Sequence, residues 1–310
     1  MRKVIGIGEI ILDIIFKEGK PYAAVPGGSV FNGIVSLSRL GIPVSFIGEV
    51  GRDKVGKMIM DFMQINRMAI EHIDYFSDSK TPVSLAFLND SKNADYIFYT
   101  NQQASPPNLL FPKINQDDIL IFGSYYAVNP LLRGRITELL EYAQSQKAII
   151  YYDPNFRKSH AHDAIRVRSS VIENFEFADI VRGSDEDFIN LYNKTEIEQA
   201  YKEEVQFYCK RFIMTQGSKG VNLSTESFRS HYDVPPITPV STIGAGDNFN
   251  AGFIYGLIQN DIGYSDLPLI DKPIWDKIIQ CGIDFSTEVC RSYSNYLSPE
   301  FTNKYKTLDC

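Results

Sequence analysis

The chain has 310 residues, of which 44% are hydrophobic and 22% charged, enough for the core of one large domain or two small ones. The formal net charge is −7, and no cluster of lysine and arginine could follow a phosphate backbone, so no nucleic-acid partner is expected. No stretch approaches the roughly 18 apolar residues of a membrane span. Because no cleavable leader is recognisable at the start, we expect a cytoplasmic protein that binds no membrane.

Short β-branched runs alternate with stretches of helical period along the chain. In chain order, the expected strands lie at 3–8, 44–48, 118–123, 148–153, 179–183 and 211–217. Amphipathic stretches between them include residues 130–146 and 185–192. This alternation predicts an α/β fold with a mostly parallel sheet covered on both faces. In such sheets, ligands bind outside the carboxyl ends of the strands.

Two segments break this alternation. Residues 83–101 contain two strand-like runs around a polar turn, and residues 10–25 are also strand-like and poor in helix signals. We expect these segments to form a small β-sheet that projects as a lid. No internal repeat or linker is visible, so residues 1–310 are predicted to form a single domain.

The stretch STIGAGDNFNAGF, residues 241–253, contains the strongest chemical signal. Gly244, Ala245 and Gly246 allow backbone N–H groups to approach a bound group closely, and apolar residues at every fourth position mark a buried helix that starts near Asp247. A helix start favours an anion such as phosphate, which a carboxylate would repel. Asp247 therefore suggests a base that accepts a proton from the group attacking the phosphate. The alternative is an ordinary N-cap carboxylate after a tight turn.

A second glycine-rich stretch, VPGGSVFNGIVSLSRLG, covers residues 25–41. Gly27 and Gly28 precede a helix that Gly41 ends, and Asn32 lies one turn inside it, off the apolar face. An amide at this position can donate to and accept from the hydroxyls of a polyol. The alternative is a plain helix start with a solvated asparagine.

Three further motifs lie at loops after predicted strands. GEVGRDKVGK, residues 48–57, indicates a loop and then a helix capped by Asp53. DPNFR, residues 153–157, places Asn155 and Arg157 at a strand end, where the guanidinium could hold a phosphate or a carboxylate. TQGSKG, residues 215–220, turns through Gly217 and Gly220, and a simple hairpin turn is the alternative.

Two patterns do not support other chemistries. GIGEI, residues 6–10, is followed by Ile11 where a dinucleotide fingerprint needs a small residue, so a nicotinamide dehydrogenase is not expected. His160 and His162 have no further cysteine or histidine nearby in sequence, so no metal site is expected there.

Taken together, GGSVFN with SRLG, GEVGRDKVG, DPNFR, TQGSKG and TIGAGD resemble the PfkB-type, ribokinase-like carbohydrate kinases in order and approximate spacing. The resemblance runs from about residue 3 to 295. It implies a three-layer α/β/α sandwich with a small β-sheet lid. It also implies transfer of the γ-phosphate of ATP to a sugar hydroxyl.

The resemblance also implies roles for individual residues. Asp247 would be the general base, the amides of Gly244, Ala245 and Gly246 the anion hole, and Arg157 a further catalytic group. The residues implied to bind sugar are Asp13, Gly27, Gly28, Asn32 and Asn155. Those implied to contact the nucleotide are Ser184, Thr215, Gly217, Gly220 and Thr242. Asp187 would bind Mg²⁺ through water.

Three positions depart from the family pattern. Ser184 replaces an amide in the segment that organises magnesium, and Ser241 replaces an aspartate that helps to hold a monovalent cation in several relatives. A hydroxyl is a poorer cation ligand, which weakens the expectation of potassium dependence. Val30 and Phe31 stand where the family has small residues, and are expected to reshape the sugar pocket.

Glu9 and Asp13, in the pattern GE-x-x-x-D, together with DPNFR, resemble the fructokinase and 2-keto-3-deoxygluconate kinase branches most. We therefore expect a ketohexose such as fructose as substrate. The alternatives are 2-keto-3-deoxygluconate, with Arg157 facing its carboxylate, another sugar or a nucleoside. A non-catalytic sugar-binding regulatory protein on the same fold is the alternative of another class. An exposed lid edge also predicts a homodimer formed through the lid.

Overall fold

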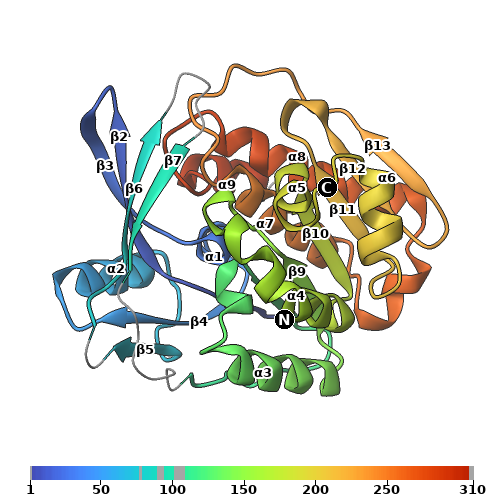
Figure 1. Cartoon of the computed structure of the whole chain (residues 1–310), viewed down its shortest axis with the longest axis horizontal. Helices are drawn as coiled ribbons and strands as arrows, with labels where there is room; N and C mark the ends of the chain where they lie inside the picture. Colours follow the sequence, from blue (N-terminus) through green and yellow to red (C-terminus); the bar gives the residue numbers. More distant parts are fainter. Residues whose placement is uncertain (1, 77–78, 89–93, 101–108, 307–310) are drawn as a thin grey trace. The chain divides into compact units, whose positions relative to one another are not determined.

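The computed structural model describes residues 2–76, 79–88, 94–100 and 109–306 (Figure 1). The chain forms two compact units, one made of residues 1–112 and 237–310 and the other of residues 113–236. The single domain over residues 1–310 stays a prediction. Among the described residues, no helix combines the length and the apolar character that crossing a membrane requires.

The first unit contains three parallel strands in the order β1 (Val4–Ile7), β4 (Val44–Gly51) and β5 (Ile73–Phe76). Val4 lies opposite Val44, and Gly48 lies opposite Ile73. All residues of β1 and β4 are buried, which explains why these runs are apolar without alternation.

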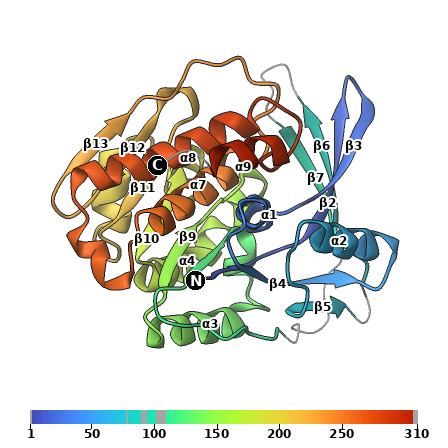
Figure 2. The ribbon, with the colours of Figure 1, turned by 180° about the vertical axis from the view of Figure 1, so that it is seen from behind.

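The helices of the first unit are α1 (Ser29–Arg39), α2 (Lys54–Ile65), α7 (Ala245–Gln259), α8 (Lys272–Val289) and α9 (Pro299–Tyr305), with a 3₁₀ turn at Tyr264–Leu269. Helix α7 contacts both α1 and α8 (Figure 2). It is buried continuously from Asp247 to Leu257, as expected for a core helix. A Cβ atom on Gly252 would lie 2.2 Å from the carbonyl oxygen of Cys281, so α7 and α8 pack backbone to backbone there.

The segments predicted as a lid form a separate small sheet in this unit (Figure 1). Its strands are β2 (Ile11–Lys17), β3 (Lys20–Gly27), β6 (Val83–Leu88) and β7 (Ala94–Tyr99), in the order β3-β2-β6-β7. Strands β2 and β6 are parallel, and the other two pairs are antiparallel. The prediction of two strand pairs is confirmed, although the turn at 89–93 and residue 101 lie outside the described residues. Ile15 and Ala86 of this sheet pack on Ile243, just before α7.

The second unit carries a mixed sheet in the order β13-β12-β11-β10-β9-β8. Its parallel strands are β8 (Ile119–Gly123), β9 (Ile149–Asp153), β10 (Ile180–Ser184) and β11 (Phe212–Thr215). The antiparallel strands are β12 (Val221–Ser224) and β13 (Arg229–Tyr232). The TQGSKG motif is therefore a hairpin connection, which was the alternative considered for it.

Its helices are α3 (Arg133–Ser145), α4 (Ala164–Phe177), α5 (Asp185–Tyr192) and α6 (Ile197–Ala200). A π-helical turn at Tyr201–Val205 continues α6, and 3₁₀ turns occupy Tyr125–Val128, Lys158–Asp163 and Gly217–Lys219. Helix α5 has the predicted bounds, and the predicted strands differ from the observed ones only near their ends. The α/β class with a mostly parallel sheet is confirmed.

The close approach of α7 and α8 predicts a specific sensitivity at Gly252. In Gly252→Ala, the added methyl group would force the two helices apart, at a cost of about 1–3 kcal/mol, because the obstacle is backbone. We expect the melting temperature to fall by roughly 2–4 °C for each kcal/mol lost. The measurement is thermal unfolding followed by circular dichroism.

Gly134→Ala in α3 is the matched control, because a Cβ there meets no atom within 4 Å. Replacing this glycine, in the first turn of α3, with alanine should then be neutral or slightly stabilising. Equal melting temperatures for the Gly252 variant and the wild type would refute the proposed packing constraint.

Candidate functional site

The start of α7 is built around Gly244. This residue is the N-cap of the helix and has φ 76°, a conformation that favours glycine. A Cβ on it would also lie 2.6 Å from the carbonyl oxygen of Asn295. The N–H of Ala245 donates to the carbonyl oxygen of Thr242 at 3.2 Å, so the turn already uses one of the three amides expected to form an anion hole. The N–H of Gly246 lies in the first helical turn, where N–H groups have no acceptor within the helix.

Asp247 is the third residue of α7, and only 4% of it is exposed. Its Oδ1 accepts a hydrogen bond from Ser29 Oγ at 3.1 Å, and its Oδ2 accepts one from Asn32 Nδ2 at 2.8 Å. Both donors belong to the first turn of α1. The carboxylate therefore lies beside the starts of two helices, α1 and α7. It is not the N-cap, since Gly244 has that role.

The two ends of the Asn32 side-chain amide differ in their hydrogen bonding. Its Nδ2 donates to Asp247, whereas its Oδ1 is buried without a hydrogen-bond partner among the described residues. Buried acceptors are normally satisfied, and a hydroxyl group of a ligand could supply the missing donor. This geometry suits the predicted contact with a polyol.

Asp13 on β2 is also buried and accepts two hydrogen bonds from side chains. Ser84 Oγ donates to its Oδ1, and Asn295 Nδ2 donates to its Oδ2 at 3.0 Å. Gly27 lies against it, because a Cβ there would be 2.2 Å from Asp13 Oδ2. Gly28 has φ 138°, and a Cβ on it would be 2.1 Å from the carbonyl oxygen of Glu9. The structure thus groups Asp13, Gly27 and Gly28 of the predicted sugar site.

Glu9 precedes the small sheet and carries the most informative pKa shift in this unit. Burial, together with the negative charge of Asp13, raises the pKa of Glu9 to about 7. The folded protein therefore binds a proton at Glu9 more tightly than the unfolded chain does.

In the second unit, a buried ion pair joins the ends of neighbouring strands. Arg182 Nη1 lies 2.8 Å from Asp153 Oδ2, and Arg182 Nη2 donates to Thr215 Oγ1 at 2.5 Å. The Oδ1 atom of Asp153 accepts a hydrogen bond from the N–H of Asn155 at 3.1 Å. Arg182 and Asp153 thus bring the predicted site residues Asn155 and Thr215 to one edge of the sheet.

Ser184 and Asp187 form a capping box at the start of α5. Asp187 Oδ2 accepts a hydrogen bond from the Ser184 N–H at 2.6 Å, and its Oδ1 accepts one from the Phe156 N–H at 2.6 Å. The pair therefore has a structural role in helix capping. Binding of Mg²⁺ through water at Asp187 stays a prediction.

The remaining predicted residues lie in loops of this unit or near α7. Arg157 is exposed at the start of the 3₁₀ turn 158–163. Gly217 and Gly220, both with positive φ, form the connection between β11 and β12. Ser241 Oγ accepts a hydrogen bond from the Ile243 N–H at 3.2 Å and is buried. No group of three or more metal-ligating histidine, cysteine, aspartate or glutamate side chains occurs within the described part of the chain.

The expectation that Val30 and Phe31 reshape the sugar pocket stays a prediction. Both are buried, and the ring of Phe31 packs edge-on against Phe46 with 5.3 Å between ring centroids. These side chains pack in the core around α1, in which every residue from Val30 to Ser38 is buried.

Sequence reasoning missed several residues that hold the site together, namely Ser29, Ser84, Arg182, Asn248 and Asn295. Ser29 opens α1 directly after Gly28, so a helix-start pattern could have drawn attention to it. Ser84, Arg182 and Asn295 have no local signal, because their partners are distant in sequence, and Asn248 has one local partner, Gly244, besides the distant Ser36 and Asn295.

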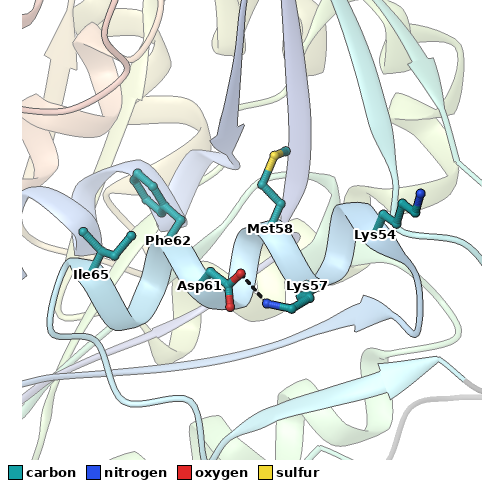
Figure 3. A pocket seen from close by; sticks show the side chains of 6 residues that line it. All are labelled: Lys54, Lys57, Met58, Asp61, Phe62 and Ile65. Atoms are coloured by element: carbon teal, nitrogen blue, oxygen red, sulfur yellow. Dashed lines mark hydrogen bonds and ion pairs between the residues drawn. The ribbon is translucent and has the colours of Figure 1, made fainter.

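A surface hollow of about 420 Å³ lies over α2 in the first unit (Figure 3). It is lined by Lys54, Lys57, Met58, Asp61, Phe62 and Ile65. Its charged rim includes the Lys57–Asp61 pair of successive helical turns. It contains none of the predicted site residues.

The raised pKa of Glu9 predicts a pH-dependent stability. Since the folded pKa of about 7 exceeds the ordinary 4.5, the contribution of Glu9 to the free energy of unfolding should fall as pH rises from 4.5 to 7. In Glu9→Gln this loss disappears, so the variant should gain stability relative to the wild type over that interval. Urea unfolding across the interval measures the difference.

Glu71→Gln, at an exposed position, is the control and should follow the wild-type curve. A constant difference between Glu9→Gln and the wild type across this pH range would contradict the assignment.

Residues 1–267 match the family described as pfkB family carbohydrate kinase. Among its relatives, the probable fructokinase-4 of Arabidopsis thaliana is 23% identical over 269 residues, which cover 83% of this chain and 82% of the relative. The probable fructokinase-7 of the same plant is 24% identical over 310 residues, covering 92% and 87%.

Solved structures with the same fold include a fructokinase from Vibrio cholerae O395, in a form with bound fructose, ADP and calcium. It has a TM-score of 0.84 and 19% identity, and the alignment covers 98% of this chain and 99% of that one. The aminoimidazole riboside kinase of Salmonella enterica has a TM-score of 0.83 and 20% identity, with 99% and 100% coverage. These likenesses show a ribokinase-like fold. With the family match over most of its length, the chain belongs to the pfkB family of carbohydrate kinases.

Proposed function

We propose that this protein transfers the γ-phosphate of ATP to a hydroxyl group of a ketohexose, with fructose as the preferred substrate. The observation that carries the proposal is the Asp247 carboxylate, buried at the start of α7 and oriented by Ser29 and Asn32. A carboxylate fixed by neutral donors can still accept a proton, as a general base must.

In the proposed reaction, Asp247 accepts the proton of the sugar hydroxyl group while the oxygen of that hydroxyl group attacks the γ-phosphorus of ATP. The new O–P bond forms while the bond to the β-phosphate oxygen breaks, and ADP leaves with that electron pair. The first turn of α7, including the Gly246 N–H, would stabilise the charge on the transferred phosphoryl group. The Ala245 N–H could donate a hydrogen bond to the phosphoryl group only if it broke its hydrogen bond to the Thr242 carbonyl oxygen.

Two groups of residues in the first unit support sugar binding. Asp13 presents an oriented carboxylate beside Gly27, and Asn32 Oδ1 offers a buried acceptor without a protein donor. The choice of fructose rests on the fructokinase relatives and on the GE-x-x-x-D pattern of Glu9 and Asp13. 2-Keto-3-deoxygluconate is the alternative, with Arg157 as the partner of its carboxylate.

We assign nucleotide contacts to Thr215, Gly217, Gly220, Ser184 and Thr242, and contacts near the transferred phosphate to Asn155 and Arg157. Mg²⁺ usually keeps several waters and is bound by few carboxylates together with the substrate's phosphates. Asp187 would therefore act on it through water. Its two oxygens already accept backbone hydrogen bonds, which suits such an indirect contact.

The proposal includes a cytoplasmic homodimer that forms through the small sheet. Strand β7 is an edge strand, and it exposes 49% of Ile97 and 61% of Tyr99. On the opposite edge, β3 exposes 56% of Tyr22. Uncovered edges with apolar side chains favour pairing with another chain.

A substrate panel tests the proposed reaction. Purified protein with ATP and Mg²⁺ is incubated with fructose, ribose, 2-keto-3-deoxygluconate or adenosine. The release of ADP is measured, and the phosphorylated product is identified by mass spectrometry. We expect the highest kcat/KM with fructose. Turnover of adenosine alone would overturn the ketohexose assignment, and no turnover of any compound would favour the non-catalytic sugar-binding alternative.

The role of Asp247 is tested by Asp247→Asn, which keeps the shape of the side chain and one acceptor oxygen but replaces the other oxygen with an NH2 group and removes the base. We expect kcat to fall by about 10²–10⁴-fold, with little change in ATP binding. The control is Asp271→Asn, at the exposed N-cap of α8, which should keep its kcat and nearly all of its stability because asparagine caps a helix about as well as aspartate. Near-normal turnover of Asp247→Asn would remove Asp247 from the mechanism.

A further inference from the structure

Asn295, in the loop between α8 and α9, is fully buried and contacts two parts of the first unit. Its side-chain Nδ2 donates to Asp13 Oδ2 on β2 at 3.0 Å. Its backbone oxygen accepts a hydrogen bond from Asn248 Nδ2 at 2.8 Å. A single residue therefore joins the proposed sugar-binding carboxylate to the helix that carries the proposed base.

Asn248 of α7, which connects Asn295 to that helix, makes further hydrogen bonds with α7 and with α1. Asn248 directly follows Asp247, and its Nδ2 also donates to the carbonyl oxygen of Gly244 at 2.8 Å. Its Oδ1 accepts a hydrogen bond from Ser36 Oγ of α1 at 2.5 Å. Ser36 Oγ in turn accepts the N–H of Leu297 at 3.0 Å, so the loop is fixed to both helices.

The side chain of Asn295 is not optimised for stability. Its Oδ1 is buried without a hydrogen-bond partner among the described residues, a condition that costs about 1–3 kcal/mol. An apolar side chain of similar size would avoid that cost but would leave Asp13 Oδ2 without this donor. The arrangement therefore favours orientation of the Asp13 carboxylate over stability of the loop.

We propose that Asn295 is a positioning residue that sets the Asp13 carboxylate, and with it the bound sugar, in register with Asp247. This inference rests on the proposed function. Proton transfer to Asp247 requires the reacting hydroxyl within hydrogen-bond reach, and a displacement of about 1 Å can cost about 100-fold in rate. Ser84 orients the other Asp13 oxygen from within the small sheet, so Asn295 supplies the link to α7.

The test compares Asn295→Ala with Asn174→Ala, a control at another fully buried asparagine that lies in the second unit and accepts a hydrogen bond from Arg133. Both variants should lower the melting temperature. We expect only Asn295→Ala to raise the KM for sugar about 10-fold or more and to lower kcat, while the KM for ATP stays within about 2-fold. Asn295→Asp, nearly identical in shape, should show the same kinetic defect because it cannot donate and faces Asp13 with a second acceptor.

The outcomes separate this inference from the proposed function. If the wild type phosphorylates a sugar and both Asn295 variants match Asn174→Ala in sugar KM and kcat, Asn295 has only a structural role and the inference fails. If the wild type phosphorylates no sugar, the proposed function fails and takes the inference with it. Should Asn295→Ala not fold, Asn295→Asp decides the question, since it preserves the volume of the side chain.

Discussion

The fixed position of the Asp247 carboxylate is the constraint on which the first unit depends. A buried charge is costly unless hydrogen bonds and favourable dipoles compensate for it. Here Ser29 and Asn32 supply the hydrogen bonds, and the starts of α1 and α7 supply the dipoles. Because both donors are neutral, they orient the carboxylate without cancelling its charge. The close approach of the helices, with a Cβ on Gly33 only 2.9 Å from the Asp247 carbonyl oxygen, keeps this geometry rigid.

Two carboxylates in the second unit show how a carboxylate with a structural role differs from that of Asp247. Asp153 is paired with the guanidinium of Arg182 at 2.8 Å, and both are buried, so its charge is balanced within the protein. Asp187 is occupied by the backbone N–H groups of Ser184 and Phe156. These two side chains hold strand ends and a helix start in place. Their environments explain why Asp247, rather than either of them, is assigned as the base, although all three are buried aspartates.

Much of the fold could be predicted from the sequence because its signals are local. Buried parallel strands appear as continuous β-branched runs, and α5 begins at a Ser-x-x-Asp capping pattern of four residues. The predicted roles of Asp53 as a cap and of Gly41 after α1 have the same local origin. The contacts that complete the site are not local: Asn295 is 282 positions from Asp13, and Ser29 is 218 positions from Asp247. No periodicity or spacing specifies such pairs, so only the folded structure reveals them.

The hydrogen bonds around Asn295 also affect the entropic cost of sugar binding. Asp13, Asn32, Asp247 and Asn295 all belong to the first unit, and hydrogen bonds within the protein orient the side chains of both aspartates. Groups that the protein itself orients do not have to be ordered by the sugar, which lowers the entropic cost of binding and of reaching the transition state. Among the described residues, the Oδ1 atom of Asn32 is a buried acceptor beside Asp247 that a hydroxyl group of a sugar can still satisfy. A preorganised acceptor of this kind favours a polyhydroxylated ligand over an apolar one, because only a hydroxyl group can supply the missing donor.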